Sequence, residues 1–277
     1  MLAENTGSQI TGTGKMTLTG DIVASGGSGI NLAMQSNSSL IGAAQYEKAA
    51  SSSLDLEMTE SEWTMTKNSS VRALGLDDST VNFATNLTGG IYGTLTTETL
   101  SGTGNRFNLR TDIAGGRGDL LVVEDAVSGS HDLAVTNNGA ANVTGDETLV
   151  IVRTTDTNAK NYFTLIAPVD LGGYQYELRA TALDAADLEL YSTGRSTGPG
   201  SASVNIFSGA YLLNYAETQT LLQRMGDLRE GESKGNIWAR AFGGKFNSSS
   251  DGFLSGFDMS YSGIQVGADR KIILKDN

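Results

Sequence analysis

The chain has 277 residues with 35 glycines, 2 prolines, no cysteine and a formal net charge of −12 at pH 7. The lack of cysteine excludes a disulfide framework and a thiol catalyst, and the acidic balance argues against nucleic-acid binding, which needs clustered Lys and Arg. A composition rich in glycine and poor in proline favours many short strands joined by tight polar turns.

Residues 1–100 form a run of short β-prone segments separated by small polar turns. Met16–Val23 alternates at strand period, and Leu54, Leu56 and Met58 share one face of a later segment. Short strands spaced by ~8–12 residues are compatible with a sandwich, a barrel or a solenoid. Three such strands would make one coil of about 20 residues, which is within the range of solenoid repeats. The pattern favours a solenoid but leaves a sandwich open.

The sequence pattern changes in the last third of the chain, from short β-prone segments to a linker, a helix and two strands. Residues 193–202 contain three glycines and a proline, which is typical of a flexible linker. Residues 203–230 are predicted to form one helix with Ser203 as its capping acceptor. Two strand-like segments are predicted within residues 235–277. In the second of them the apolar residues alternate with polar residues or glycine; they are Ile264, Val266 and Ala268.

This last third contains three motifs: Arg224-Met225-Gly226-Asp227-Leu228-Arg229, Ile237-Trp238-Ala239-Arg240 and Gly263 to Asp269. Together they resemble the helix-to-barrel junction of classical autotransporters, the type V secretion system of Gram-negative bacteria. The resemblance implies a helix inside an outer-membrane pore, followed by the first strands of an incomplete antiparallel β-barrel. An amphipathic helix followed by a soluble hairpin is the alternative interpretation.

Two earlier regions are similar to the passenger of pertactin-like autotransporters. Glu62 to Thr66 and Ser70 to Leu74 resemble late coils of a right-handed parallel β-helix, so the resemblance favours a solenoid for residues 1–100. Residues 101–192 resemble the C-terminal cap, which acts in the family as an autochaperone; its motif residues are Gly118, Asp119, Leu120, Tyr174 and Tyr176. A cap is physically required, because the last coil would otherwise present unpaired strand edges and an apolar cross-section.

The resemblance also implies a location and partners for the complete protein. The passenger would reach the cell surface through the periplasm, and the barrel would enter the outer membrane with the help of the barrel-assembly machinery. A host or bacterial surface ligand is implied but not identified, and no cofactor or metal is expected. Because no signal peptide follows Met1 and only two barrel strands are predicted, we expect an internal fragment.

The resulting hypothesis is the display and folding of a non-catalytic, adhesin-type passenger. Gln219 and Thr220 occupy the positions at which self-cleaving protease toxins carry an Asn pair, which favours surface-retained adhesins over a protease-toxin fragment. The other alternative is a β-helical carbohydrate-active enzyme, either a lyase or a tailspike-like hydrolase, which would need grouped acidic residues. The candidates Asp55, Glu57, Glu60 and Glu62 are more typical of a solvated face.

Other candidate residues have ordinary structural interpretations. Arg117-Gly118-Asp119 spells a cell-attachment tripeptide, but in the family this place holds a structural Gly-Asp before a buried strand. His131, the only histidine, is predicted to lie in a surface turn, which leaves little support for a Ser-His-Asp triad. Trp63 and Phe83 are expected in the core.

Overall fold

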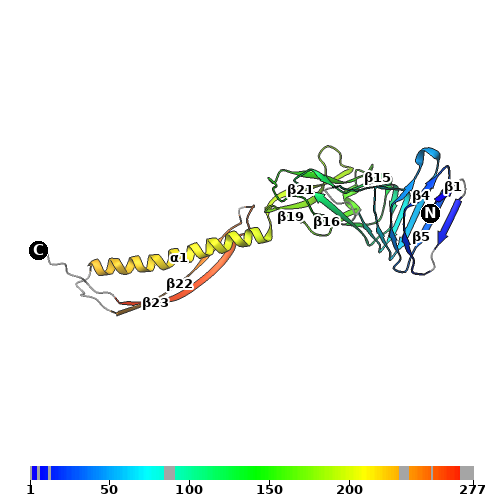
Figure 1. Cartoon of the computed structure of the whole chain (residues 1–277). Helices are drawn as coiled ribbons and strands as arrows, with labels where there is room; N and C mark the ends of the chain where they lie inside the picture. Colours follow the sequence, from blue (N-terminus) through cyan, green and yellow to red (C-terminus); the bar gives the residue numbers. More distant parts are fainter. Residues whose placement is uncertain are drawn as a thin grey trace. The chain divides into compact units, whose positions relative to one another are not determined.

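The computed structural model describes residues 2–4, 7–11, 14–83, 91–230, 237–250 and 252–268. The chain divides into two compact units, Met1–Thr193 and Gly194–Asn277. The first unit is a parallel β-solenoid, and the second consists of one helix and two antiparallel strands (Figure 1). The expected solenoid is therefore confirmed, and a sandwich is excluded.

Each coil of the first unit contributes strands to two long sheets, and the early coils also contribute to a third. In the described part of the chain, the longest sheet begins with seven parallel strands: β2 (Gly7–Thr11), β5 (Gly29–Met34), β8 (Ser53–Thr59), β10 (Ser69–Asp77), β12 (Thr94–Ser101), β15 (Leu120–Val127) and β17 (Thr148–Arg153). The second sheet stacks β3 (Thr17–Thr19), β6 (Ser39–Ile41), β9 (Glu62–Thr64), β11 (Thr80–Asn82), β13 (Asn105–Asp112), β16 (His131–Asn137) and β18 (Phe163–Leu165), with β14 (Arg117–Gly118) antiparallel to β13. The third sheet holds β1 (Leu2–Glu4), β4 (Ile22–Ser25) and β7 (Ala44–Tyr46). Two 3-10 turns complete the unit, η1 (Lys48–Ala50) and η2 (Ala159–Asn161).

The core is built from columns of apolar side chains, because the parallel register places equivalent positions of successive coils above one another. One column of the longest sheet consists of Leu32, Leu56, Leu74, Leu100 and Val127. The facing column of the second sheet consists of Leu40, Trp63, Val81, Phe107 and Leu133. Trp63 and Phe83 are both buried, as expected, and the Trp63 indole donates to the Gly42 carbonyl at 2.9 Å.

Glycines allow adjacent coils to approach closely where the chain turns between sheets. Gly102 has φ +102°, and a Cβ there would lie 1.6 Å from the Leu76 carbonyl oxygen of the neighbouring coil. Gly129 repeats this arrangement one coil later, at 1.9 Å from the Gly102 oxygen. Any side chain at these positions would force the coils apart.

Gly102→Ala is therefore expected to lower the free energy of unfolding by about 1–3 kcal/mol, through backbone strain and coil separation. Denaturant unfolding followed by circular dichroism measures this loss. Ser101→Ala, at the exposed end of β12, is the matched control and should leave the unfolding midpoint nearly unchanged. Equal midpoints for the two variants would contradict the close approach.

The parallel stack ends in three antiparallel strands. They are β19 (Val169–Leu171), β20 (Tyr174–Ala180) and β21 (Asp187–Ser196), and β21 pairs with the last parallel strand of the longest sheet, β17. Parallel coils continue on both sides of residue 100, so the architecture changes near Val169 rather than at the start of the 101–192 region. Antiparallel strands end the stack because they satisfy the edge of β17 without offering a further parallel coil.

The expected flexible linker at residues 193–202 is wrong. Strand β21 extends to Ser196, and helix α1 (Gly198–Glu230) begins five residues before the predicted Ser203. The physical reason is a cap at Thr197, whose side-chain oxygen accepts from the Gly200 amide at 3.2 Å while its carbonyl accepts from Ser201 at 2.9 Å. Pro199 fits because the first helical turn needs no amide donor there.

In the second unit, β22 (Ile237–Ser248) pairs antiparallel with β23 (Phe257–Ala268). Their side chains alternate, and Ile264 and Val266 lie on the exposed face as the sequence predicted. The other face pairs aromatic rings with glycines, since a Cβ at Gly267 would meet the Trp238 ring at 2.6 Å. Helix α1 runs beside β23, and the Glu217 carbonyl accepts from the Gln265 side chain at 3.4 Å (Figure 1).

Among the described residues, no helix has both the length and the apolar character needed to cross a bilayer.

Candidate functional site

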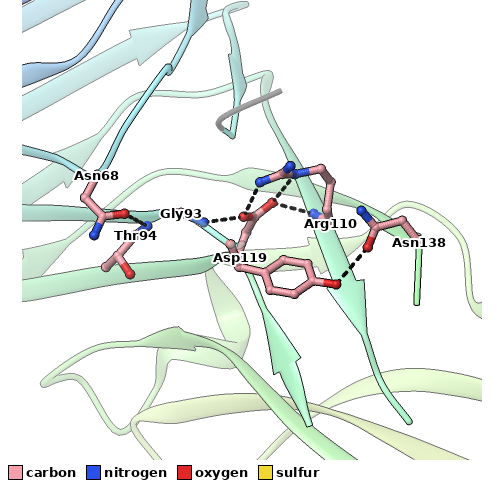
Figure 2. Close-up of polar contacts among 7 residues, drawn as sticks. Asn68, Gly93, Thr94, Arg110, Asp119 and Asn138 are labelled. Atoms are coloured by element: carbon pink, nitrogen blue, oxygen red, sulfur yellow. Dashed lines mark hydrogen bonds and ion pairs between the residues drawn. The ribbon is translucent and has the colours of Figure 1, made fainter. Parts of the chain in front are cut away.

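The Asp119 carboxylate is a buried acidic group of the first unit that accepts four hydrogen bonds. Its side chain is 0% exposed and lies between β14 and β15. It accepts from the Gly93 amide at 2.6 Å, and from the Arg110 amide, Nε and Nη2 at 2.7, 3.0 and 2.9 Å (Figure 2). A bidentate guanidinium and two backbone amides together compensate for burying this charge.

This carboxylate closes the base of a short hairpin, β13–β14. At the tip of the hairpin, Asp112 accepts from the Gly115 amide at 3.0 Å and from Arg117 Nη2 at 2.8 Å. The hydrogen bond from Arg117 is the main reason that the pKa of Asp112 is lowered. At the base, the Asp119 amide donates to the Arg110 carbonyl at 2.8 Å. The Arg110–Asp119 pair at the base and the Arg117–Asp112 pair at the tip therefore fix the two ends of a loop that interrupts the regular coil.

The structure argues against cell attachment through Arg117-Gly118-Asp119. Arg117 is paired with Asp112, and the Asp119 carboxylate is buried against Arg110, so a receptor cannot reach both charged groups together. Gly118 is half-buried, and a Cβ there would lie 3.1 Å from Leu149. Leu120 follows as the first residue of β15. The structural Gly-Asp interpretation of this motif agrees with these contacts.

Tyr176 connects the antiparallel cap to the loop that precedes β17. Its hydroxyl donates to Glu147 Oε2 at 2.8 Å, and the same carboxylate accepts from the amides of Thr144 and Gly145 at 2.7 and 2.9 Å. Burial alone would raise the pKa of Glu147, but these hydrogen bonds outweigh it and lower the pKa to about 2. Tyr174, two residues earlier, packs its ring against Gly145.

The prediction of a surface turn at His131 is wrong, because this residue begins β16 and is 1% exposed. The imidazole lies between the rings of Phe107 and Phe163, with ring centroids at 6.0 and 5.4 Å. Burial lowers its pKa. One ring nitrogen contacts the Asn105 amide nitrogen at 3.3 Å and the other the Ser128 carbonyl at 3.0 Å. Both nitrogens are therefore occupied, which leaves no free base for a catalytic triad.

The acidic candidates of the carbohydrate-active alternative are divided between two sheets. Asp55 lies on β8 of the longest sheet and accepts from Arg72 Nε at 2.8 Å, and Glu57 shares that strand. Glu60 lies in the following turn, and Glu62 lies on β9 of the second sheet. In the described ranges no three His, Cys, Asp or Glu side chains are grouped to hold a metal ion. The structure does not bring these four carboxylates to one face.

Trp238 and Arg240 of the junction motif lie on β22, each half-buried. Arg224, Met225, Gly226, Asp227, Leu228 and Arg229 lie in α1, and their side chains are outside the described residues, as is Asp269. The order of helix and strands agrees with the sequence prediction.

Arg110 and Glu147 were not singled out by sequence reasoning, although they hold the predicted residues Asp119 and Tyr176. A usable signal did exist for Arg110: a Gly-Gly pair between two β-prone runs indicates a hairpin, and Arg110 and Asp119 flank that hairpin with opposite charges. Glu147 carried no comparable signal, because its partner lies 29 residues away.

Comparisons with known proteins agree with the solenoid. The Pertactin family matches residues 71–190. The Escherichia coli K12 protein named "Probable autotransporter YcgV" is 36% identical over 96% of this chain and 31% of its own length. The BrkA autotransporter of Bordetella pertussis is 30% identical over 91% of this chain and 25% of its own. The serine protease Pet autotransporter of Escherichia coli O44:H18 is 28% identical over 81% and 17%. The chain spans less than a third of the length of each of these relatives. It contains the pertactin-type passenger region of a classical autotransporter.

Proposed function

We propose that this chain forms the membrane-proximal end of a surface-displayed, adhesin-type passenger and templates the folding of that passenger. The observation that carries the proposal is the end of the parallel stack, where β19–β21 close the longest sheet at the end of the Pertactin match. A closed end can fold first, because it needs no further coil to satisfy its strand edge. Earlier coils can then add to it one by one.

The second unit fits the connection to the membrane. In the proposal, α1 occupies the pore of an outer-membrane barrel, and β22 and β23 begin the wall of that barrel. Their exposed apolar face and their glycine–aromatic pairs suit strands that meet lipid on one side. The complete protein would then reach the cell surface through the periplasm, with the barrel-assembly machinery as a partner.

The proposed role involves no catalysis by this chain. Pet is named a serine protease, and a serine protease of the common type needs a histidine base. The sequence has one histidine, and His131 is buried with both nitrogens occupied. A protease function in a longer protein would therefore have to lie outside this chain.

Limited proteolysis with mass spectrometry tests the folding role. We expect a protected fragment of residues 94–191 that persists after residues 1–58 are digested, because the cap closes that end of the stack. The same digestion of the Tyr176→Ala variant should lose the protected fragment, and residues 1–58 should be digested faster, because the earlier coils then lack their template. Equal or greater resistance of the N-terminal coils would overturn the templating role.

A further inference from the structure

A surface cavity of about 540 Å³ lies beside the β13–β14 hairpin. Strand β14 of the hairpin lies next to β17. In the described ladder, β15 and β17 pair only at Leu121–Val152 and Val122–Arg153, and the cavity lies where this pairing is interrupted. Thr148, at the start of β17, lines the cavity opposite the hairpin. A volume of this size falls within the range of ligand-binding clefts.

The charge of the cavity differs from that of the chain. The chain carries a formal net charge of −12, whereas the charged residues that line the cavity are two arginines, Arg117 and Arg153. Each has one acidic neighbour, Asp112 at 2.8 Å and Asp187 at 3.6 Å. The arginine side chains are still 59% and 57% exposed, and a guanidinium has five N–H donors.

The remaining lining is apolar or hydroxylated. Leu120 and Val150 form a half-buried apolar surface, and the Tyr92 ring adds an aromatic one. Tyr92 is held in place by its hydroxyl, which donates to Asn138 at 2.9 Å, and by the Arg110 guanidinium, 5.8 Å from the ring centre. Thr148 adds an exposed hydroxyl. Two guanidinium groups beside an apolar and aromatic wall suit a ring that carries a carboxylate and hydroxyl groups.

We propose that this cavity binds a carboxylate-bearing saccharide, with Arg117 and Arg153 holding the carboxylate and Tyr92, Leu120 and Val150 packing against the apolar face of the sugar ring. The proposal adds a ligand class to the adhesin role proposed above, and it rests on that role. A free acidic peptide offers the same charge but lacks a rigid ring to match the wall.

Calorimetric titration of the whole purified chain tests this directly and does not depend on surface display. The probes are a hexuronate oligosaccharide and the same oligosaccharide with its carboxylates reduced to alcohols. We expect binding of the acidic form alone. Arg117→Gln and Arg153→Gln should each weaken it about tenfold, as expected for a lost charge-assisted hydrogen bond.

Arg106→Gln is the matched control, because it removes the same charge from an exposed position of β13 that does not line the cavity. Thr148→Glu places a carboxylate in the cavity without touching the Arg117–Asp112 pair, and it should abolish binding while thermal unfolding stays unchanged. Lack of binding at millimolar oligosaccharide, equal binding of the reduced probe, or tighter binding of an acidic peptide would overturn the proposal. Failure of the proteolysis test alone would leave this binding result unaffected.

Discussion

Asp119→Asn is expected to lower the free energy of unfolding of the first unit by about 3–5 kcal/mol, because removal of one partner leaves the other charge buried and unpaired. Asp119 is 0% exposed and Arg110 17% exposed, so solvent can screen little of the loss. The asparagine keeps the shape of the side chain, but its amide nitrogen would face the donors of Gly93 and Arg110. Denaturant unfolding at neutral pH measures the change.

Asp125→Asn is the matched control, since it removes the same charge from an exposed position of β15 and should cost less than about 0.5 kcal/mol. The double variant Asp119→Asn with Arg110→Gln should be far less destabilised than the sum of the single variants, because both remove the same ion pair. Additive losses, or a loss at Asp119 no larger than at Asp125, would show that the pair does not hold the hairpin.

The alternation of apolar and polar residues along each strand correctly predicted which side chains face the core of the solenoid. Leu54, Leu56 and Met58 share one buried face, and Ile264 and Val266 share one exposed face, because a strand fixes side-chain direction residue by residue. Alternation could not choose a solenoid over a sandwich, since pairing partners are not local. Residues in register across coils, such as His131 and Phe163, lie as far as 32 positions apart, and only the family resemblance supplied that arrangement.

One of the two failed predictions shares this cause. His131 follows Gly129 and Ser130, a pair typical of a turn, and its burial depends on Asn105 in the preceding coil. Residues 193–202 are rich in glycine, and the cap at Thr197 becomes recognisable only when β21 is known to end at Ser196. A distant strand therefore decided the conformation at His131, whereas the contacts that begin the helix at Thr197 are local.

The position of His131 makes the first unit sensitive to acid. Asn105 Nδ2 can only donate and the Ser128 carbonyl can only accept, so the neutral imidazole accepts at Nδ1 and carries its proton on Nε2. Asn105 cannot turn its amide over without losing the contact of its oxygen with the Ser79 amide at 3.4 Å. A second proton on Nδ1 would therefore face a donor in a buried site.

We expect the stability of the first unit to fall as the pH drops below about 6.5, the ordinary pKa of histidine. Burial lowers the pKa of folded His131, and the hydrogen bond to Ser128 and the charge of Asp132 only partly oppose this effect. The unfolded chain therefore binds the proton first. The contribution is fully present above the unfolded pKa and is lost as the pH falls toward the folded pKa, by at most about 1.4 kcal/mol per pH unit. Unfolding midpoints measured between about pH 7.5 and 5.5 report this slope.

His131→Ala is expected to cost about 2–4 kcal/mol at neutral pH, because it leaves a cavity between Phe107 and Phe163 and removes the partners of Asn105 and Ser128. It should also remove the slope, since the sequence contains no other histidine. The control Asp132→Asn keeps the imidazole and should keep the slope. If His131→Ala retained the full acid sensitivity, the assignment of the slope to His131 would be contradicted. Asp187 could not supply the slope, because burial raises its folded pKa, and such a carboxyl gains stability as the pH falls. Glu147, whose pKa is lowered to about 2, loses its contribution only below about pH 4.5, outside the measured range.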